Sequence, residues 1–585
     1  MSQSGDGKVL LLHPDDDPLS FPELKWSLIV DLGRAPESTY QSWGRHLACP
    51  VMSLFDLTEG TDDLHRTREL LECGMGEAVD EFGIDWWDVL AQSIVPQIQQ
   101  LILLRRLATT IDTGADVYST RPHYLASALQ NLLGGKLITV QSASQRMFHA
   151  VRHYADALQQ LEFAQLTQVI QDKFDPQHKI RRLTADRPKS SARPFVLLPS
   201  AYVNVSRTAV AYAAMLPDVE FLLLTARNNG RLGIRPANVR HTSLDGYFSS
   251  VNDGDARMLR QAYRRLRLRL ASCAAEFEIA QASGVLAALE SWLMWGLAVR
   301  DAWNVVFDSE KITACLCADD SNPYSRLPLI IAKSRGIPAL ACHHGALDNR
   351  MAIKKQHADL YLAKSEMERD YLVRLCCVAK ERIVIGAPAC LQPPVESRNP
   401  TPSSADWIVF FTEPYHSSGW RTGEIYRELL PKLLVLARDS GLELVFKLHP
   451  FESAAGHRRT LRRYLDSPAA QQIRIITGPT PPELWQNTIC ALTAQSSVAL
   501  ECSARGIPIF LCGWLSDPCA GYVQQFERFG IGQVLRSPQE LDQVPHWIAS
   551  SSQLAPQNNS SKTMDPETLH QLLSGAYSCP AAASA

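Results

Sequence analysis

The chain has 585 residues, and its 58 Lys and Arg nearly balance its 61 Asp and Glu, so the formal charge at pH 7 is −3. This balance gives no general attraction to nucleic acid or to an acidic membrane surface, and it excludes a function that depends on a large net charge of the whole protein. The length allows about three domains with a sizeable core each, and no run of about 20 apolar residues predicts a membrane-spanning helix.

The first 140 residues alternate short apolar runs with longer helical patterns, which is typical of an α/β domain. Gly134 and Gly135 are placed to end a helix between two short strands. We expect a Rossmann-like accessory module over residues 1–185, whose function the sequence leaves open. Strands are predicted at Val9–Leu12, Leu28–Asp31, Val51–Phe55, Asp116–Ser119 and Leu137–Val140, and helices at Glu77–Ile111 and Ala143–Lys173.

A Pro-rich connector at 185–194 precedes a second α/β unit, which we expect over residues 195–390. Near its start the apolar runs Phe195–Leu198 and Glu220–Leu224 predict strands. The segment Arg257–Ala271 predicts an amphipathic helix with four arginines outside its apolar face. A solvated surface explains this helix, and contact with an anionic lipid-linked acceptor is the alternative.

The densest passage of this unit begins with the apolar run Ile312–Cys317, and the acidic pair Asp319-Asp320 follows it. A helical pattern then closes on Arg335–Pro338, and a further apolar run leads to His343-His344-Gly345. The same order, a helix closing on Arg-Gly-Ile-Pro before a strand and a glycine-bearing loop, returns at Arg505–Pro508. The recurrence predicts two similar Rossmann-like halves.

A second linker, at 391–406, holds four prolines and precedes a third α/β unit, which we expect over residues 407–545. From about residue 550 the sequence is rich in Ser, Gln, Asn and Pro, so we expect a disordered tail over 550–585. Strands of the third unit are predicted at Trp407–Phe411, Leu442–Leu448, Ile489–Thr493 and Ile507–Cys512.

Two of these strands stop at polar loops that we expect to share one crevice, because ligands of open α/β sheets bind beyond the carboxyl ends of the strands. The first loop is Lys447–Pro450, which supplies the imidazole of His449. The second contains Ser496 and Ser497, which supply hydroxyls at the start of a helix, where backbone N–H groups and the helix dipole favour a phosphate. Glu501, one turn later, is placed to accept hydrogen bonds from ribose hydroxyls. The pattern predicts a nucleotide site in two pieces.

Each piece alone has a structural explanation, since a Ser-Ser pair before an apolar helix is commonly an N-cap. The order is more specific: strand, His-Pro, about forty residues, strand, Ser-Ser, helix, Arg-Gly-Ile-Pro, strand. It resembles the donor domain of GT-B-fold glycosyltransferases over roughly residues 310–515. In particular it resembles the bacterial enzymes with an HP and an SS motif, which include sialyl- and polysialyltransferases, capsule polysaccharide transferases and teichoic-acid glycerophosphate transferases.

The resemblance implies an α/β fold with a GT-B-like pair of Rossmann-like domains, here with the N-terminal module added. It implies that His449, Ser496 and Ser497 hold the phosphates of a donor nucleotide and that Glu501 binds its ribose. In a GT-B donor domain the loop after Trp407–Phe411 borders the same cleft, which makes Glu413 a further donor contact. The full predicted donor set is Glu413, Lys447, His449, Pro450, Ser496, Ser497 and Glu501.

A general base for the acceptor hydroxyl is expected on the opposite side, from His344, Asp319 or Asp320, since all three follow strands of the middle unit. In the resembling capsule and glycerophosphate enzymes a His-Gly in this place has been treated as catalytic, and His344-Gly345 matches it. His343 precedes it and blurs the assignment. The sialyltransferases use an acidic motif that ends in Gly, whereas Asp319-Asp320 is followed by Ser321, so the choice of base stays open.

No other cofactor or metal is expected. We find no convincing metal-binding DxD, because the run Asp15-Asp16-Asp17 lies in the N-terminal loop, far from these motifs. The 14 cysteines include no CxxC pair, and the N-terminus lacks the basic start and long apolar region of a signal peptide. We therefore expect a cytoplasmic protein, and peripheral association with the inner face of a membrane stays open.

The interpretation is a metal-independent, inverting glycosyltransferase that builds a surface polysaccharide or similar glycan. Its partners would be a CMP-, CDP- or UDP-linked sugar or polyol phosphate donor and a glycan or lipid-linked acceptor. Two alternatives stay open: an isomerase like the UDP-N-acetylglucosamine 2-epimerases, which needs no acceptor, and a non-catalytic sugar-nucleotide-binding assembly subunit.

Overall fold

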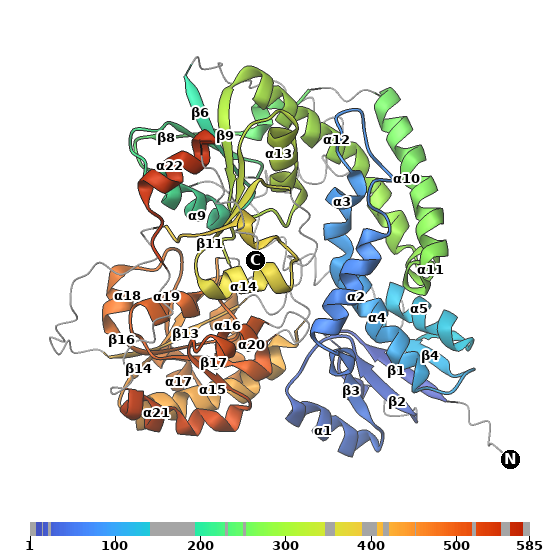
Figure 1. Cartoon of the computed structure of the whole chain (residues 1–585). Helices are drawn as coiled ribbons and strands as arrows, with labels where there is room; N and C mark the ends of the chain where they lie inside the picture. The colour runs from blue at the N-terminus through green and yellow to red at the C-terminus, as the bar shows by residue number, and fades with distance from the viewer. Residues whose placement is uncertain are drawn as a thin grey trace, which may run out of the picture.

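Three parallel β-sheets follow one another along the chain in the computed structural model (Figure 1). The structure describes residues 7–14, 16–20, 25–140, 193–227, 232–249, 253–345, 357–388, 406–413, 420–450, 452–516, 522–551 and 562–576. The helix expected at 143–173 and most of the linkers expected at 185–194 and 391–406 lie outside these residues.

The first sheet has five parallel strands in the order β3-β2-β1-β4-β5, and its strands are those expected from the sequence. The long helix expected at 77–111 is wrong in its first part, because residues 77–85 form turns. Pro96 lies in the first turn of α4, where its missing N–H costs nothing. The strands are β1 (Lys8–Leu12), β2 (Leu28–Asp31), β3 (Val51–Ser53), β4 (Asp116–Ser119) and β5 (Leu137–Thr139), and the helices are α1 (Glu37–Leu47), α2 (Thr61–Glu72), α3 (Trp86–Ala91), α4 (Val95–Thr109) and α5 (Tyr124–Leu133).

The second sheet has seven parallel strands in the order β12-β11-β10-β9-β6-β7-β8. The chain starts at β6 in the middle, runs outward to β8, and returns to β9 on the other side of β6. This reversal is the doubly wound arrangement, which opens a crevice at the carboxyl ends of β6 and β9. The elements are β6 (Pro194–Ser200), β7 (Phe221–Thr225), β8 (Val239–Ser243), β9 (Lys311–Cys317), β10 (Ala339–Ala341), β11 (Leu360–Ala363), β12 (Ile383–Ile385), α9 (Val203–Ala213), α13 (Pro323–Ser334) and α14 (Glu366–Arg374).

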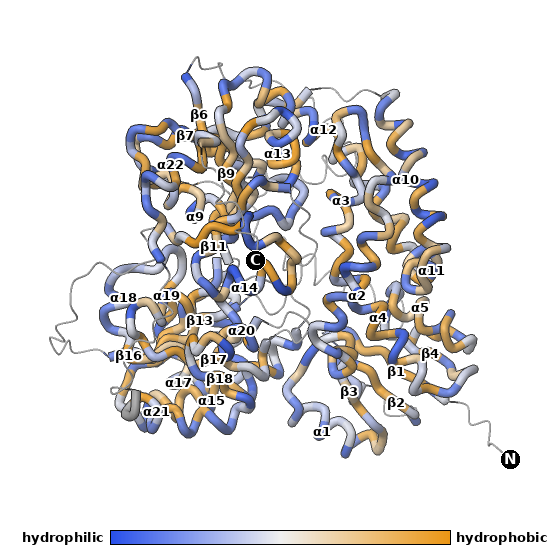
Figure 2. The backbone as a smooth tube through the Cα atoms, in the orientation of Figure 1, coloured by the Kyte–Doolittle hydropathy of each residue, from blue (hydrophilic) through white to orange (hydrophobic). Residues whose placement is uncertain are grey.

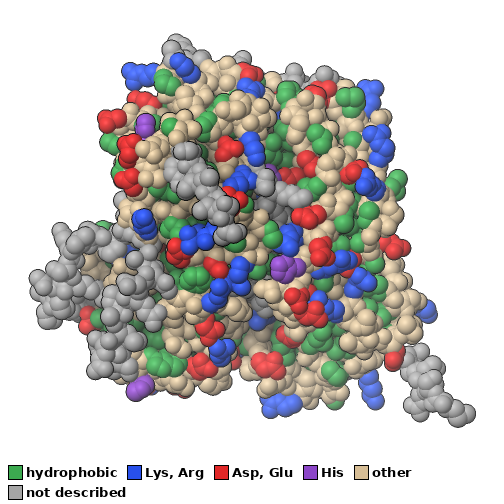
Figure 3. All heavy atoms as spheres, viewed as in Figure 1, with side chains coloured by type: hydrophobic (Ala, Val, Ile, Leu, Met, Phe, Trp, Pro, Cys, Tyr) green, Lys and Arg blue, Asp and Glu red, His purple; other side chains and the backbone are tan. Residues whose placement is uncertain are grey.

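Three helices between β8 and β9 form a layer against the N-terminal module: α10 (Asp253–Cys273), α11 (Ala275–Ala282) and α12 (Val285–Ser309) (Figure 1). The arginines of α10 include Arg264 and Arg267, which pair with Glu290 of α12 at 2.6 and 3.2 Å. On the face drawn in Figure 3, basic and acidic side chains are interspersed. Among the described helices none alone has the length and apolar composition of a membrane span, although α11 and α12, bent by 72°, reach that threshold together.

The third sheet has six parallel strands in the order β15-β14-β13-β16-β17-β18, which is again doubly wound. Its strands are β13 (Trp407–Phe411), β14 (Glu443–Lys447), β15 (Arg474–Ile476), β16 (Thr488–Thr493), β17 (Ile509–Cys512) and β18 (Gln533–Leu535). Its helices are α15 (Thr422–Asp439), α16 (Ala454–Tyr464), α17 (Ser467–Gln472), α18 (Pro482–Asn487), α19 (Val498–Ala504), α20 (Tyr522–Arg528) and α21 (Val544–Ser551).

The strands are continuous apolar runs because helices cover both faces of each doubly wound sheet. Strand β7 reads FLLLT and β13 reads WIVFF, and every residue of both is buried. In Figure 2 the strands are mainly orange and the outer helix faces are mixed with blue. The largest cluster of buried apolar side chains passes through all three units and includes Val9, Leu197 and Val409.

The last described segment corrects the expected disordered tail. Residues 562–576 return to the second sheet, where Ala387 and Thr563 form a parallel bridge and the N–H of Met564 donates to the carbonyl of Ala387 at 2.8 Å. Helix α22 (Pro566–Ser574) then buries Leu569, Leu572 and Leu573 in the same core as β6 and β9. The prediction failed because it used the average composition of residues 550–585, which is polar, and did not consider the apolar stripe of this short helix.

Arg421 joins the N-terminal module to the third unit. The side chain is buried, and its Nε donates to Oδ2 of Asp31 at 2.7 Å. Its two other nitrogens donate to the backbone carbonyls of Asp16 at 2.6 Å and His13 at 2.8 Å. The hydroxyl of Tyr40 also donates to Oδ2 of Asp31 at 2.9 Å. Each charge is thus both paired and hydrogen-bonded, which is the condition under which an ion pair is tolerated in an interior.

We predict that Arg421→Met destabilises the protein by about 3–5 kcal/mol, because it leaves the buried carboxylate of Asp31 without its positively charged partner. The measurement is the urea midpoint of unfolding. Arg438→Met is the matched control, since Arg438 is exposed and pairs only with its neighbour Asp439. The double variant Asp31→Leu/Arg421→Met, which removes both charges, should recover part of the loss. A loss no larger than that of the control would contradict the prediction.

Candidate active site between the second and third sheets

A cavity of about 660 Å³ lies between the second and third units. Its walls are loops at the carboxyl ends of strands from both sheets, together with part of α9 and of α19. All the site residues expected from the sequence line it except Asp320. The parallel order of both sheets explains this convergence, because all the carboxyl ends of a parallel sheet lie at one edge.

Asp320 is not brought to the cavity. Consecutive side chains along an extended backbone point to opposite sides. Asp319 lines the cavity, whereas Asp320 is fully buried. Its backbone carbonyl accepts a hydrogen bond from Nε of Arg326 at 2.9 Å. Its charge acts on His357 and Tyr361, which lie behind the cavity wall.

The loop after β14 carries two basic groups. Nζ of Lys447 donates to the carbonyls of Leu448 at 3.0 Å and Gly478 at 2.8 Å. Burial lowers the pKa of Lys447 to about 8, so the amine is mainly charged at neutral pH. Burial, together with the charges of His344 and Lys447, lowers the pKa of His449 to about 4, so this imidazole is neutral before any ligand binds. His344 and His449 line the same cavity from its two walls.

The loop after β16 is tied to the loop after β13. Oε1 of Glu413 accepts a hydrogen bond from the backbone N–H of Gln495 at 2.9 Å. Burial raises the pKa of Glu413 to about 7. Oγ of Ser496 accepts from the N–H of Val498 at 3.3 Å, whereas Ser497 makes no side-chain capping hydrogen bond at the start of α19. The Ser497 hydroxyl is therefore not committed to the helix.

Glu501 lies on α19 and lines the cavity one turn beyond Ser497. Burial raises the pKa of its carboxyl, against the charges of Arg505, Lys364 and Arg207. Arg207 on α9 and Lys364 after β11 are cavity residues that the sequence analysis missed. Lys364 directly follows the apolar run of β11, so the rule that placed Asp319 at a strand end would also have found it.

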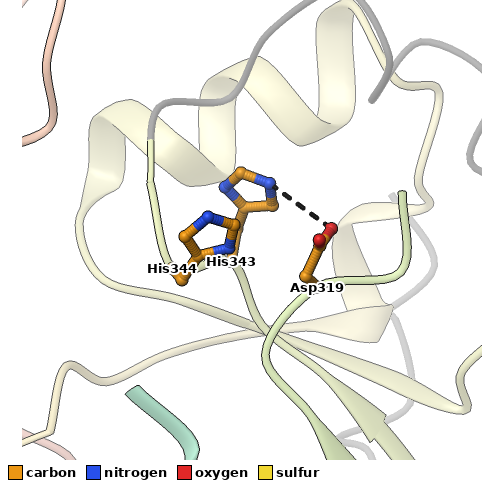
Figure 4. A group of neighbouring side chains, drawn as sticks. All are labelled: Asp319, His343 and His344. Carbon is orange, nitrogen blue, oxygen red and sulfur yellow. Dashed lines mark ion pairs between the residues drawn. The ribbon is translucent and has the colours of Figure 1, made fainter. Parts of the chain in front are cut away.

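The opposite wall holds Asp319, His343 and His344 (Figure 4). The two imidazole rings are stacked with their centroids 5.0 Å apart, and Nε2 of His343 lies 3.9 Å from Oδ1 of Asp319. Asp319 is held by its own loop: Oδ1 accepts from the N–H of Ser321 at 2.9 Å, and Oδ2 accepts from the amide of Asn322 at 2.9 Å. The three side chains come from the ends of the neighbouring strands β9 and β10.

The charges of this cluster are set by competing effects. Burial raises the pKa of Asp319, but the two imidazoles and the hydrogen bonds from Ser321 outweigh it and hold the pKa at about 2. Burial lowers the pKa of His344, against the opposing effects of Asp319 and of a hydrogen bond with the Ala318 backbone. At neutral pH the cluster therefore pairs an ionised carboxylate with a neutral His344. Nδ1 of His344 is buried without a hydrogen-bond partner in the described part of the chain.

The same three residues form the one group in the described chain with the spacing of metal ligands. One ligand atom from each of Asp319, His343 and His344 lies within 4.8 Å of the others. Two imidazoles and a carboxylate are a donor set that suits zinc or iron. Against this, both oxygens of Asp319 already accept hydrogen bonds from Ser321 and Asn322, so a metal would have to share them.

No protein-family model matches the chain, and no curated protein matches it. Among solved structures, Methanocaldococcus jannaschii UDP-GlcNAc 2-epimerase in complex with UDP-GlcNAc and UDP is 10% identical with a TM-score of 0.39, over 65% of this chain and 98% of that one. The S. aureus MnaA-UDP co-structure is 11% identical with a TM-score of 0.41, over 65% and 95%. A histidine-to-asparagine variant of the wall teichoic acid polymerase TagF is 11% identical with a TM-score of 0.39, over 71% and 99%.

The fold is GT-B-like. Two doubly wound units face each other across the cavity, and the N-terminal module forms a third α/β unit. The arrangement of the sheets thereby confirms the fold class expected from the sequence.

We predict that pyrophosphate, used as an anionic probe of the cavity, binds about tenfold more weakly at pH 8 than at pH 6, apart from the titration of the phosphate itself. Between these values the carboxyl of Glu413, with a pKa of about 7, becomes an anion beside the loop that carries Ser496. Titration calorimetry over this range measures the effect. Glu413→Gln keeps the shape and removes the charge, so it isolates the contribution of Glu413. The same pH dependence in wild type and variant would refute this role.

Proposed function

We propose that this chain is a metal-independent, inverting glycosyltransferase that moves a sugar or polyol phosphate from a CMP-, CDP- or UDP-linked donor to a glycan or lipid-linked acceptor. One observation supports it above the others. The cavity sets the basic and hydroxyl-bearing loops of the third unit opposite the Asp319–His344 cluster of the second. Displacement at a phosphate-activated centre needs such an arrangement, because the leaving phosphate and the incoming hydroxyl lie on opposite sides of it.

In this proposal the third unit holds the donor. The charged amine of Lys447, the imidazole of His449 and the hydroxyl of Ser497 surround the diphosphate. They stabilise the negative charge that develops on the leaving group. His449 would be protonated as the phosphates bind, since a nearby anion raises the pKa of an imidazole. Glu501 would accept hydrogen bonds from the ribose hydroxyls.

His344 is the proposed general base. Its imidazole takes the proton of the acceptor hydroxyl while the acceptor oxygen bonds to the activated centre of the donor and the bond to the leaving phosphate breaks. The neutral state of His344 suits it to accept a proton, and the ionised Asp319 stabilises the imidazolium that forms. Asp319 itself is a poor base because its pKa is about 2, and Asp320 does not reach the cavity.

We predict that His449→Ala and Ser497→Ala each weaken UDP or CDP binding by roughly ten- to hundredfold, since a hydrogen bond to a charged group contributes on the order of 1.5–3 kcal/mol. Glu501→Ala should weaken the binding of uridine or cytidine as well, because its partner is the ribose. Calorimetry on the three variants measures this. Ser334→Ala is the control, because Ser334 lies exposed at the end of α13, outside the cavity. Unchanged affinity in His449→Ala and Ser497→Ala would remove the basis of the donor site.

We predict that His344→Ala lowers the rate of transfer by roughly 10²–10⁴-fold while donor affinity stays within about twofold, which is the pattern of a lost general base. Single-turnover transfer, with the donor identified by its thermal stabilisation of the protein, measures both quantities. His343→Ala should cost less, and Asp320→Asn should cost least.

Three results would redirect the proposal. Full activity of His344→Ala with an inactive Asp319→Asn would move the base to the carboxylate. Activity that is lost with EDTA and restored by Zn²⁺ would make the Asp319 cluster a metal site. An epimer formed from a UDP-sugar alone, without acceptor, would identify an epimerase.

A further inference from the structure

A second cavity, of about 250 Å³, opens beside the first and is built by three parts of the chain. The N-terminal module supplies Gln92 and Ser93, at the junction of α3 and α4. Helix α12 supplies Trp292, and the second unit supplies Tyr324 at the start of α13 and Arg227 after β7. The module of unassigned role therefore forms one wall.

Three of the side chains that line this cavity are half-buried aromatics, Tyr202, Trp292 and Tyr324. The rings of Trp292 and Tyr324 form a T-shaped pair, with centroids 6.4 Å apart and an interplanar angle of 86°. Nε1 of Trp295 donates to the hydroxyl of Tyr324 at 2.9 Å, which sets the plane of that ring. The C–H face of a sugar ring is apolar and packs against the electron-rich face of an aromatic ring. Rigid aromatic walls with hydrogen-bonding neighbours are thus suited to a carbohydrate.

Among the described residues that line this cavity, Arg227 carries the positive charge. Its guanidinium lies over the rings of Tyr324 at 4.7 Å and Tyr202 at 5.3 Å, and its Nη1 donates to the hydroxyl of Tyr202 at 2.9 Å. No acidic side chain lines the described part of this cavity. Arg227 is exposed and is oriented by the two rings, so it can pair with an anionic group on a ligand.

The second cavity shares two wall residues with the first. Tyr202 and Ser321 line both cavities. The N–H of Ser321 donates to Oδ1 of Asp319, which lies beside His343 and His344. A ligand in the second cavity would therefore contact a residue, Ser321, that hydrogen-bonds directly to Asp319.

We propose that the second cavity binds the acceptor, and that the acceptor is an anionic glycan whose sugar packs against Trp292 and Tyr324 and whose carboxylate or phosphate pairs with Arg227. This proposal rests on the proposed function, and it assigns the N-terminal module a role as one wall of the acceptor site. The proposed acceptor contacts, Trp292, Tyr324 and Arg227, line only the second cavity, whereas the proposed donor contacts are Lys447, His449 and the Ser496-Ser497 loop of the first.

Ligand-observed NMR on the full chain tests this proposal. The probes are uronic acids, hexose 1-phosphates and the matching neutral hexoses in the gluco, galacto and manno series, so that carboxylate and phosphate are compared on one scaffold. We expect at least one anionic sugar to bind more tightly than its neutral counterpart. Arg227→Ala should weaken it about tenfold and leave the neutral sugar unchanged, and Arg227→Lys should recover part of the loss.

Two controls separate local from general effects. Arg240→Ala removes an exposed arginine on the neighbouring strand β8, outside both cavities, and should change nothing. Trp292→Leu should weaken anionic and neutral sugars alike, and because Arg227 is exposed, its variants remain informative if Trp292→Leu does not fold. The proposal is overturned if no anionic sugar binds, if binding survives Arg227→Ala, or if UDP or CDP displaces the sugar competitively, since the sugar would then occupy the donor cavity.

The failure of this proposal can be distinguished from the failure of the proposed function. Nucleotide binding should be unchanged in Arg227→Ala and weakened in Ser497→Ala. If UDP and CDP do not bind but an anionic sugar binds in a manner that depends on Arg227, the proposed transferase function is refuted and the sugar site remains. The reverse outcome would refute the acceptor site alone.

Discussion

Every described strand pair in this protein is parallel, and the position of the site follows from that constraint. A parallel pair needs a crossover, which here places helices on both faces of each sheet and brings all the strand ends to one edge. Residues that follow β13, β14 and β16 converge for this reason, although Glu413 and Ser497 are separated by more than eighty positions. The second sheet obeys the same rule, so two polar edges face each other across one cavity.

The arrangement buries ionisable groups in that cavity, and removing their charged forms from water costs free energy. Desolvation lowers the pKa values of His449 and Lys447 and raises those of Glu413 and Glu501. Each shift moves a group toward its neutral form, so the cavity by itself holds less charge than its composition indicates. A bound diphosphate would reverse part of this, since its negative charge favours protonated His449 and Lys447. Donor binding and protonation of the cavity should therefore be linked.

The N-terminal module is attached to both of the other units. The buried pair of Arg421 and Asp31 joins it to the third unit, and Arg326 joins it to the second by donating to the Asp88 backbone at 3.0 Å. His357 also contacts the carboxylate of Asp88. These contacts are buried and polar, so they fix orientation as well as proximity. A wall of the second cavity supplied by this module is consistent with that attachment.

The local sequence determined the strands and the loops that end them. Runs such as WIVFF at β13 and the order His-Pro, Ser-Ser and Arg-Gly-Ile-Pro depend on residues within a few positions of each other, so periodicity and turn chemistry were enough to place Lys447–Pro450, Ser496, Ser497 and Glu501 on one edge. The tertiary structure alone decided which side of the β9 end faces the cavity, since the choice between Asp319 and Asp320 depends on the backbone direction after the strand. It also decided the contacts of Arg421 with Asp31 and the meeting of Gln92 with Trp292 and Tyr324. Those residues are hundreds of positions apart, and their contacts depend on how whole layers pack, which no local pattern encodes.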